Sequence, residues 1–135
     1  NFSSGVNVVY RLVAAASSAL SAAGGYDPFI EEAHHARKKD APSGTALKLV
    51  SIVRQTAGRE VGVAVTRAGQ ITGTHRVGFD GEVDQILLTH SAKSRVGFAD
   101  GALFAARWIV GRGPGVYEFD EAIEELVASR GKATE

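Results

Sequence analysis

The sequence contains no cysteine and no methionine among its 135 residues, and it carries no excess of charge of either sign. Without cysteine the chain has no disulfide and no thiol nucleophile, which suits a cytoplasmic protein. Fifteen basic and fifteen acidic residues cancel, and this balance argues against a large nucleic-acid footprint. No uninterrupted apolar run reaches the roughly 18 residues of a membrane span. We therefore expect a cytoplasmic protein that has neither nucleic acid nor a membrane as its partner.

The missing methionine, together with the start of the chain at Asn1, indicates a piece of a longer protein. The G-x-G-x-x-G loop of a dinucleotide-binding Rossmann domain is also absent from the sequence. The length suits one domain, residues 1–135, and a hydrophobic content of 44% is enough for a buried core. We expect a single globular domain without a Rossmann domain in this chain.

The first part of the sequence alternates between helix and strand patterns. Apolar residues at helical spacing predict a helix that begins near Ser3–Ser4 and ends at Gly24. The segment PFIEEAHH (28–35) alternates as a strand does, although its glutamates and alanine favour a helix by propensity. Ser43 is the expected cap of a second helix that runs to about Ala57.

The second part of the sequence changes to a period of two. Three antiparallel strands are predicted, the last of them after an Asp80-Gly81 turn, from the segments VGVAVT (61–66), GTHRVGFD (73–80) and EVDQILLTHSA (82–92). Helical spacing returns over residues 98–109, and Asp120 is the candidate cap of a short last helix before a frayed tail, GKATE. These elements predict an α+β fold: a small mixed or antiparallel sheet of about four strands with helices packed on one face.

One stretch, EEAHHARKKDAPSGTA (31–46), concentrates the titratable and cationic side chains. It leads into a helix whose first N–H groups, at Gly44 and Thr45, have no partner within the helix and attract a carboxylate or phosphate. A well-capped helix alone would explain the Ser-Gly-Thr sequence. The residues just upstream favour an anion site instead, because they bring positive charge: His34, His35, Arg37, Lys38 and Lys39.

The adjacent histidines differ in what they are expected to do. On a strand His34 and His35 point to opposite faces, so they do not easily share one metal ion. No cysteine or nearby acidic ligand completes a tetrahedral set, even with His75 and His90, and we expect no metal site. A histidine is by default structural, but an imidazole beside an anion exchanges protons near its ordinary pKa of about 6.5. Lys38 is a second proton donor or a charge clamp. The residues alone leave the reaction open.

The segment EAHHARKKDAPSGTA (32–46) resembles the signature of the dihydrodipicolinate reductase family. Three further segments resemble motifs of that family: NFSSGVN (1–7), TRAGQITGTHRVGF (66–79) and THSAKSRVGFADGALFAARW (89–108). The resemblance runs from Asn1 to about Trp108 and continues less distinctly to about Glu125. It covers the substrate-binding and oligomerisation domain of the family and not its N-terminal Rossmann domain.

The resemblance implies a reaction. The family transfers a hydride from NADPH or NADH to 4-hydroxy-tetrahydrodipicolinate, a cyclic dicarboxylate, in the diaminopimelate route to lysine. By motif position His34 would be the acid–base histidine and Lys38 the proton donor. His35, with the backbone of Gly44 and Thr45, would bind a substrate carboxylate.

The resemblance also implies partners. Asn1, Phe2, Arg95 and Phe98 fall where the family lines its cofactor, which the missing N-terminal domain would mainly bind. A homotetramer is implied, and the fragment alone is expected to be inactive. Two alternatives stay open: a stand-alone anion-binding module, and an oligomerisation domain without catalysis.

Overall fold

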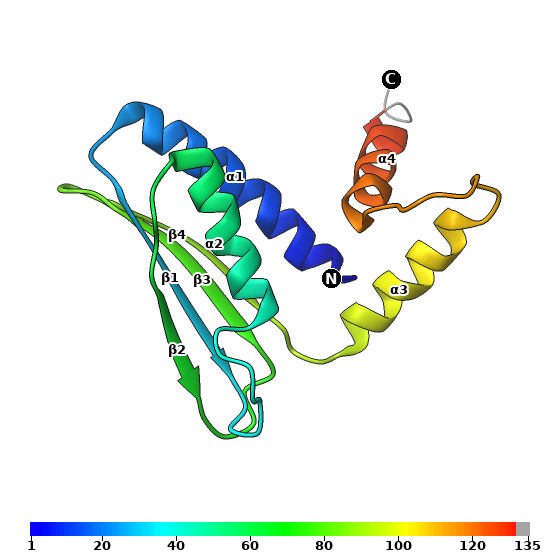
Figure 1. The fold of residues 1–135 in the computed structure, drawn as a ribbon, viewed down its shortest axis with the longest axis horizontal. Helices are drawn as coiled ribbons and strands as arrows, with labels where there is room; N and C mark the ends of the chain where they lie inside the picture. The colour runs from blue at the N-terminus through cyan, green and yellow to red at the C-terminus, as the bar shows by residue number, and fades with distance from the viewer. Residues whose placement is uncertain (132–135) are drawn as a thin grey trace. The chain divides into compact units, whose positions relative to one another are not determined.

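The computed structural model describes residues 1–131, which form four helices and four strands (Figure 1). In chain order these elements are α1 (Ser4–Ala23), β1 (Asp27–His34), α2 (Gly44–Ala57), β2 (Val63–Arg67), β3 (Thr74–Asp80), β4 (Gln85–Ser91), α3 (Val96–Ile109) and α4 (Phe119–Gly131). The chain divides into two compact units, which are described separately below. The sheet unit is Val8–Ser94, and the terminal unit combines Asn1–Asn7 with Arg95–Glu135. The single domain expected for residues 1–135 stays a prediction. Residues 132–135 of the predicted frayed tail lie outside the described part.

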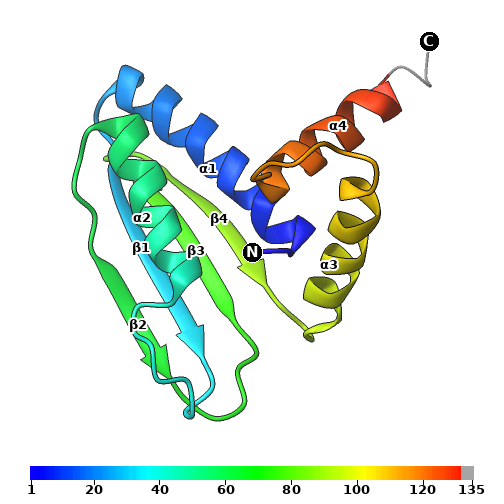
Figure 2. The same cartoon turned by 45° about the vertical axis from the view of Figure 1, so that its right-hand side comes forward.

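The sheet has the strand order β2-β1-β3-β4 and is mixed, which confirms the predicted α+β class (Figure 2). β1 pairs antiparallel with β3, and β3 pairs antiparallel with β4. The prediction of three antiparallel strands was wrong for β2, which lies parallel to β1 at the edge of the sheet. Because α2 connects β1 to β2, the chain crosses over and returns in the same direction, as parallel pairing requires. Alternation alone identifies a strand but not its partner.

Helices α1 and α2 cover one face of this sheet, as the predicted architecture required (Figures 1 and 2). Along β1 the side chains of Ile30, Glu32 and His34 are buried on that face, and those between them are half-buried. The hydrophobic core lies between the sheet and the helices and comprises Val13, Ile30, Leu49, Val53, Val77 and Phe79. The alternation of β1 therefore places Glu32 and His34 on the same, helix-covered side.

The other face of the sheet is not covered by a helix of the sheet unit. Leu87 pairs with Gly78 on this face and is 47% exposed. The ring of Phe29 fills the place that a side chain at Gly78 would need, since a Cβ there would lie 2.1 Å from its Cζ. Val63 and Val77 both pair with Ile30 and lie on the opposite, helix-covered face, because directly opposed residues share a face.

Among the described residues, α1 alone is long and apolar enough by length and composition to cross a membrane. Counting only uninterrupted apolar runs misses it, because serines and Arg11 interrupt the run. Its residues Val13 and Ser17 are nevertheless buried in the sheet unit. A core helix meets the same criteria, so this single helix is weak evidence for a membrane partner.

Capping explains where α2 begins and ends and where α4 begins. The Ser43 hydroxyl accepts from the amide of Ala46 at 3.2 Å, and Gly58, with φ 64°, ends α2, as predicted. The prediction that Asp120 caps the last helix was wrong. The carboxylate of Glu121 instead accepts from the amide of Glu118 at 2.7 Å, so the helix begins one residue before Asp120.

The terminal unit holds the first residues of the chain against α3. A Cβ at Gly101 would lie 1.6 Å from the carbonyl oxygen of Phe2, so only glycine fits this contact. The ring of Phe2 packs edge-on against Phe119 with centroids 5.5 Å apart. The side chain of Asn7 donates to the carbonyl of Asn1 at 2.8 Å. Residues 1–3 are therefore fixed within this unit.

Candidate active site

The loop between β1 and α2, residues 35–43, is fastened to the segment between β2 and β3. The amide of Ala68 donates to the carbonyl of His34 at 3.0 Å, and that of Ala36 donates to Gly69 at 3.2 Å. The peptide bond before Pro42 is cis. The two backbone hydrogen bonds from Ala68 and Ala36 fix the backbone at the end of β1, where the two histidines lie.

Glu32 is the centre of a buried polar network. Its Oε1 accepts from the amide of Ser43 at 3.0 Å and from Nη2 of Arg67 at 2.7 Å, while its Oε2 bonds to Nδ1 of His34. Burial, the largest single influence, raises the pKa of Glu32, but the bonds from Arg67, Ser43 and His34 together bring it below its usual value. The carboxylate is therefore ionised at neutral pH in spite of its burial.

His34 is buried, and its imidazole is enclosed on several sides. Its ring lies edge-on to that of His75, with centroids 5.1 Å apart. A Cβ at Gly73 would lie 3.0 Å from its Nε2. Burial lowers the pKa of His34, opposed by the bond to Glu32 and reinforced by the positive charges of Lys38 and Arg67. The neutral form of His34 therefore predominates at neutral pH, with Nδ1 engaged by Glu32.

His75 connects this network to the start of α2. Its Nε2 lies 3.0 Å from the hydroxyl of Ser43, the residue that caps the helix. Burial, with the proximity of His34, lowers the pKa of His75 to about 4. His75 is therefore neutral at pH 7 and places no positive charge beside His34.

Lys38 and the helix start provide the positive side of the site. Nζ of Lys38 donates to Asp40 at 2.7 Å, and this bond lowers the pKa of the Asp40 carboxyl. An anion would thus compete with Asp40 for Lys38. Gly44 is exposed, and no atom lies within 4 Å of the place of its missing Cβ. Gly44 and Thr45 are the first two residues of α2, at the end of the helix where the backbone amides point outward.

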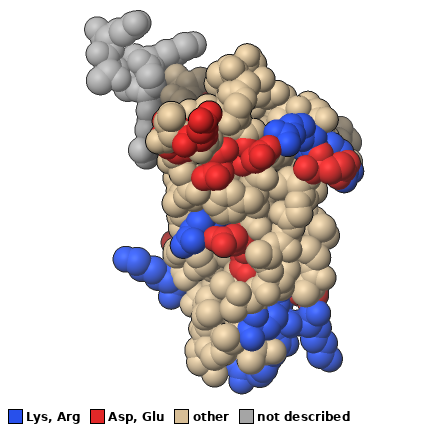
Figure 3. All heavy atoms as spheres, turned by 90° about the vertical axis from the view of Figure 1, so that its left-hand side faces the viewer, with Lys and Arg blue, Asp and Glu red and all other residues tan. Residues whose placement is uncertain are grey.

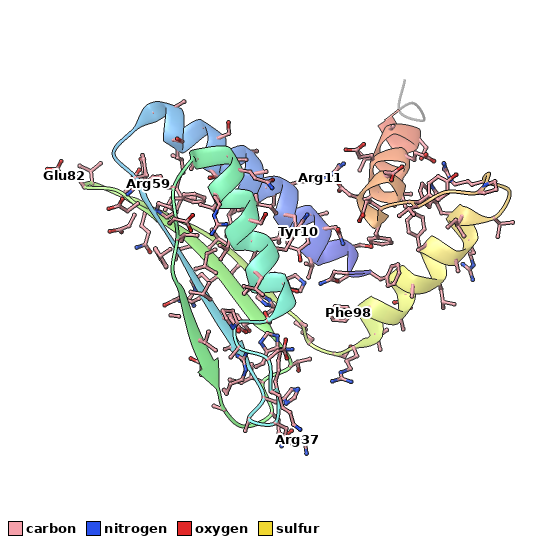
Figure 4. All side chains as sticks on the ribbon, in the orientation of Figure 1. Tyr10, Arg11, Arg37, Arg59, Glu82 and Phe98 are labelled. Carbon is pink, nitrogen blue, oxygen red and sulfur yellow. The ribbon has the colours of Figure 1, made fainter. Side chains whose placement is uncertain are left out.

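Positive charge gathers at this end of the sheet unit. Figure 3 shows Lys and Arg side chains together at the lower end of the molecule, and Figure 4 places Arg37 at the tip of the β1–α2 loop. His35, which follows His34 on the chain, is half-buried, and its Nδ1 has no hydrogen-bond partner. The structure thus brings His34, His35, Lys38 and the start of α2 together at one end of the sheet.

Glu32, His34 and His75 also offer three ligand atoms within 4.8 Å of one another. The argument that no acidic ligand lies near the histidines was therefore wrong, because the strand places Glu32 beside His34. The guanidinium of Arg67 on the same carboxylate opposes a cation, and Oε2 of Glu32 is already bonded to His34. The absence of a metal site stays a prediction.

The four residues expected near the cofactor all belong to the terminal unit, whereas the residues expected to bind the substrate belong to the sheet unit. Phe2 is 48% exposed and Phe98 is 38% exposed. Arg95 precedes α3 without capping it through its side chain, and Figure 4 shows Phe98 beside the start of that helix. Asn1 accepts through Oδ1 from the amide of Ser3 at 2.9 Å. Their contact with a cofactor stays a prediction.

Sequence reasoning missed the residues that hold His34 in place. Glu32 stands two positions before His34 on a strand, so the period of two already placed both on one face. Arg67, Gly73 and His75 lie in the second motif, TRAGQITGTHRVGF, whose arrangement around His34 only the sheet pairing reveals. No pattern in the sequence links Ser43 to His75.

The structure is an α+β domain in which a buried carboxylate–imidazole pair, Glu32 and His34, lies at the end of a strand and contacts the residue that caps α2. The family described as "Dihydrodipicolinate reductase, C-terminus" matches residues 5–123. This chain belongs to that family. It spans about half the length of the curated relatives that it matches.

Two of these relatives illustrate the similarity. The 4-hydroxy-tetrahydrodipicolinate reductase of Myxococcus xanthus (strain DK1622) is 41% identical over 142 residues, which cover 91% of this chain and 52% of the relative. The reductase of the same name from Methanosarcina mazei is 40% identical over 138 residues, 91% of this chain and 51% of the relative. Among solved structures, a dipicolinate-bound dihydrodipicolinate reductase from Paenisporosarcina sp. TG-14 has the same fold. Its TM-score is 0.74 at 22% identity, over 90% of this chain and 52% of that one.

Proposed function

We propose that this chain is the substrate-binding and catalytic domain of a 4-hydroxy-tetrahydrodipicolinate reductase, a cytoplasmic enzyme of the diaminopimelate route to lysine. The observation that carries the proposal is the placement of a buried, carboxylate-held imidazole, His34, at the end of β1, in the network that Glu32 and Ser43 form with the start of α2. The relatives that bear this name match 91% of the chain. The solved structure with the same fold was obtained with dipicolinate, a dicarboxylate.

The substrate site lies at the N-terminus of α2. The amides of Gly44 and Thr45 donate to one carboxylate, which the helix dipole also favours. His35 and Lys38 add positive charge or hydrogen bonds from the loop above. Since Asp40 holds Lys38 in the structure, substrate binding would replace that ion pair with one to the substrate.

The proton chemistry belongs to His34 and Lys38. Addition of a hydride to a conjugated imine leaves an electron-rich atom that needs a proton. An ammonium group is a suitable proton donor, and a neutral imidazole can take up a proton and return it. His34 would serve as the acid–base group and Lys38 as the proton donor to the substrate.

NADPH or NADH would supply the hydride when bound. The residues present fit such a group, because Phe2 and Phe98 expose ring surface and Arg95 offers a positive charge for a phosphate. Asn1 would add polar backbone and side-chain groups. Most of the cofactor would be held by a Rossmann domain that precedes this chain in a longer protein, so this chain alone would not turn over.

A homotetramer is the proposed assembly. The sheet face that carries Leu87 is not covered by a helix of the sheet unit, and burial of this apolar residue against another copy would stabilise an oligomer. The same uncovered face favours the second candidate function, which is an oligomerisation domain without catalysis.

The test is a reductase assay of the protein in which a cofactor domain precedes this chain. We expect turnover of 4-hydroxy-tetrahydrodipicolinate with NADPH or NADH, and loss of turnover in His34→Ala. A protein that binds dicarboxylates but turns over with neither cofactor would favour a stand-alone anion-binding module, and the reductase proposal would be wrong.

A further inference from the structure

The side chain of Glu32 is fully buried, with 0% exposure, whereas that of His34 is 11% exposed. A bound substrate therefore has access to His34 but not to Glu32. Any effect of Glu32 on a reaction therefore passes through the groups that it contacts, and His34 is the one of these to which the acid–base role is assigned. The site as described gives Glu32 no part in binding or proton transfer.

The protonation of the pair follows from the other contacts of Glu32. Its carboxylate is ionised and is therefore only an acceptor. Since Oε2 lies at hydrogen-bond distance from Nδ1 of His34, Nδ1 has to carry the hydrogen. In the neutral imidazole the second nitrogen, Nε2, then has a free lone pair. Gly73 leaves room beside this atom, because a Cβ there would lie 3.0 Å from it.

We propose that Glu32 is a positioning residue that fixes the tautomer of His34, so that Nε2 is the atom that takes up and releases the proton. This inference rests on the proposed acid–base role of His34. Glu32 itself touches neither the substrate nor the cofactor in this account. It acts by holding the ring in one orientation and one protonation state.

Glu32 is itself held by two groups from different elements. Arg67 lies at the end of β2. Its Nη2 group donates a hydrogen bond to Oε1 of Glu32 at 2.7 Å and another to the carbonyl of Asp40 at 2.6 Å. Ser43 donates its amide to the same Oε1 at 3.0 Å. Both contacts involve the loop that carries Lys38, so the orientation of the carboxylate is tied to that of the loop. A carboxylate restrained at three points holds its histidine more rigidly than one free to rotate.

Replacement of Glu32 by glutamine makes a specific test possible. In Glu32→Gln the amide oxygen still accepts from Arg67 and Ser43, so the amide NH₂ faces Nδ1 of His34. The NH₂ group donates, and Nδ1 then has to be the acceptor. The variant is therefore expected to move the imidazole hydrogen from Nδ1 to Nε2. Glu31→Gln is the matched control, because Glu31 lies on the same strand but pairs with Arg76 at 2.8 Å on the exposed face.

The measurement is the ¹⁵N NMR spectrum of the His34 ring in the 135-residue chain at neutral pH. We expect the Nδ1–H tautomer in the unaltered protein and in Glu31→Gln, and the Nε2–H tautomer in Glu32→Gln. The Nε2–H tautomer in the unaltered protein would overturn the proposal, and so would an unchanged tautomer in folded Glu32→Gln. If Glu32→Gln does not fold, the tautomer of His34 in the unaltered protein alone tests the proposal.

A second readout is the titration of His34. The groups that face its ring are Glu32, Lys38, Arg67 and His75. Because only Glu32 is negative among them, its removal leaves the positive charges unopposed. The pKa of His34 is expected to fall in Glu32→Gln and to stay unchanged in Glu31→Gln. A pKa that does not fall in Glu32→Gln would contradict the positioning role.

Turnover separates this proposal from the one on which it rests. In the protein with its cofactor domain, Glu32→Gln is expected to lower kcat by about tenfold or more with little change in KM, as removal of a supporting group does. Unchanged turnover in His34→Ala would overturn the proposed function but leave the tautomer result standing. Unchanged turnover in Glu32→Gln, with a loss in His34→Ala, would overturn only the positioning role.

Discussion

Gly73 lies directly against the imidazole of His34, so closely that a Cβ on it would come within 3.0 Å of Nε2. The φ angle of Gly73 is 150°, in a region that other residues rarely adopt. The segment between β2 and β3 therefore both borders the proposed proton-transfer atom and requires glycine for its backbone. The space around His34 depends on a residue that offers no functional group.

The first prediction follows from this contact. Gly73→Ala should displace the His34 ring and lower turnover about tenfold, and the backbone strain should cost about 1–3 kcal/mol of stability. Gly69→Ala is the matched control, because Gly69 also has a positive φ of 46° but nothing lies within 4 Å of its missing Cβ. Steady-state kinetics and urea unfolding would check both variants. Equal losses of turnover in the two variants would mean that strain, and not His34, is responsible.

The second prediction concerns the two proposed proton-transfer groups. His34→Ala and Lys38→Ala should lower kcat by about 10²–10⁴-fold and weaken substrate binding much less, because both groups act mainly in the transition state. Arg37→Ala is the control, since Arg37 lies in the same loop and its guanidinium donates to the side chain of Gln70 at 3.4 Å. Steady-state kinetics would separate kcat from KM. Wild-type kcat with a raised KM in both variants would refute the assigned roles.

The third prediction is a pH dependence of stability. The pKa of His75 is about 4 in the folded chain, below its ordinary value of 6.5, so the unfolded chain binds more protons between these values. Stability from this group is complete above pH 6.5 and is lost as the pH falls towards 4. Urea unfolding at pH 7 and at pH 4.5 should therefore show a loss that is smaller in His75→Gln. An equal loss in both proteins would exclude His75 as a cause.

The fourth prediction concerns assembly. Leu87→Glu should dissociate the proposed oligomer, because it places a charge on the uncovered sheet face, which another copy would bury. Val83→Glu is the control, since Val83 lies in the β3–β4 turn and is 90% exposed. Sedimentation of the unaltered protein and both variants would decide. A protein that is monomeric at high concentration without any substitution would contradict the assembly.

Much of the fold follows from local signals in the sequence. Ser43 and Gly58 bound α2 because capping depends on the residues at the helix ends themselves. The place of β2 did not follow, because pairing depends on partners distant in sequence, and its alternation is the same for a parallel and an antiparallel neighbour. Asp120 is the better N-cap by residue type, but the Glu121 carboxylate accepts from the amide of Glu118 and the helix begins before Asp120.

The site was predictable in its outline only. The loop from His34 to Thr45 stood out because cations and a helix start are neighbours along the chain. Glu32 lies two residues before His34 on the same strand, so the spacing of the sequence places it beside the imidazole. Arg67 and Gly73 come from segments that meet His34 only in the folded sheet, so their contribution depends on long-range pairing and no local spacing indicates it.

A dicarboxylate is proposed to bind where α2 begins, at Gly44 and Thr45. Gly44 has no positive φ and no atom within 4 Å of the place of its missing Cβ, so Gly44→Val should leave the fold intact and fill the space that the carboxylate needs. Gly62→Val is the matched control, because Gly62 is also exposed and unobstructed but lies before β2.

The most direct measurement is a titration of the chain with pyridine-2,6-dicarboxylate, a planar mimic of the proposed substrate, followed by NMR. We expect shifts at residues 34–46, binding that weakens at high salt, and loss of binding in Gly44→Val but not in Gly62→Val. Shifts confined to residues far from this loop, or the same affinity in Gly44→Val as in the unaltered chain, would contradict the proposed binding site.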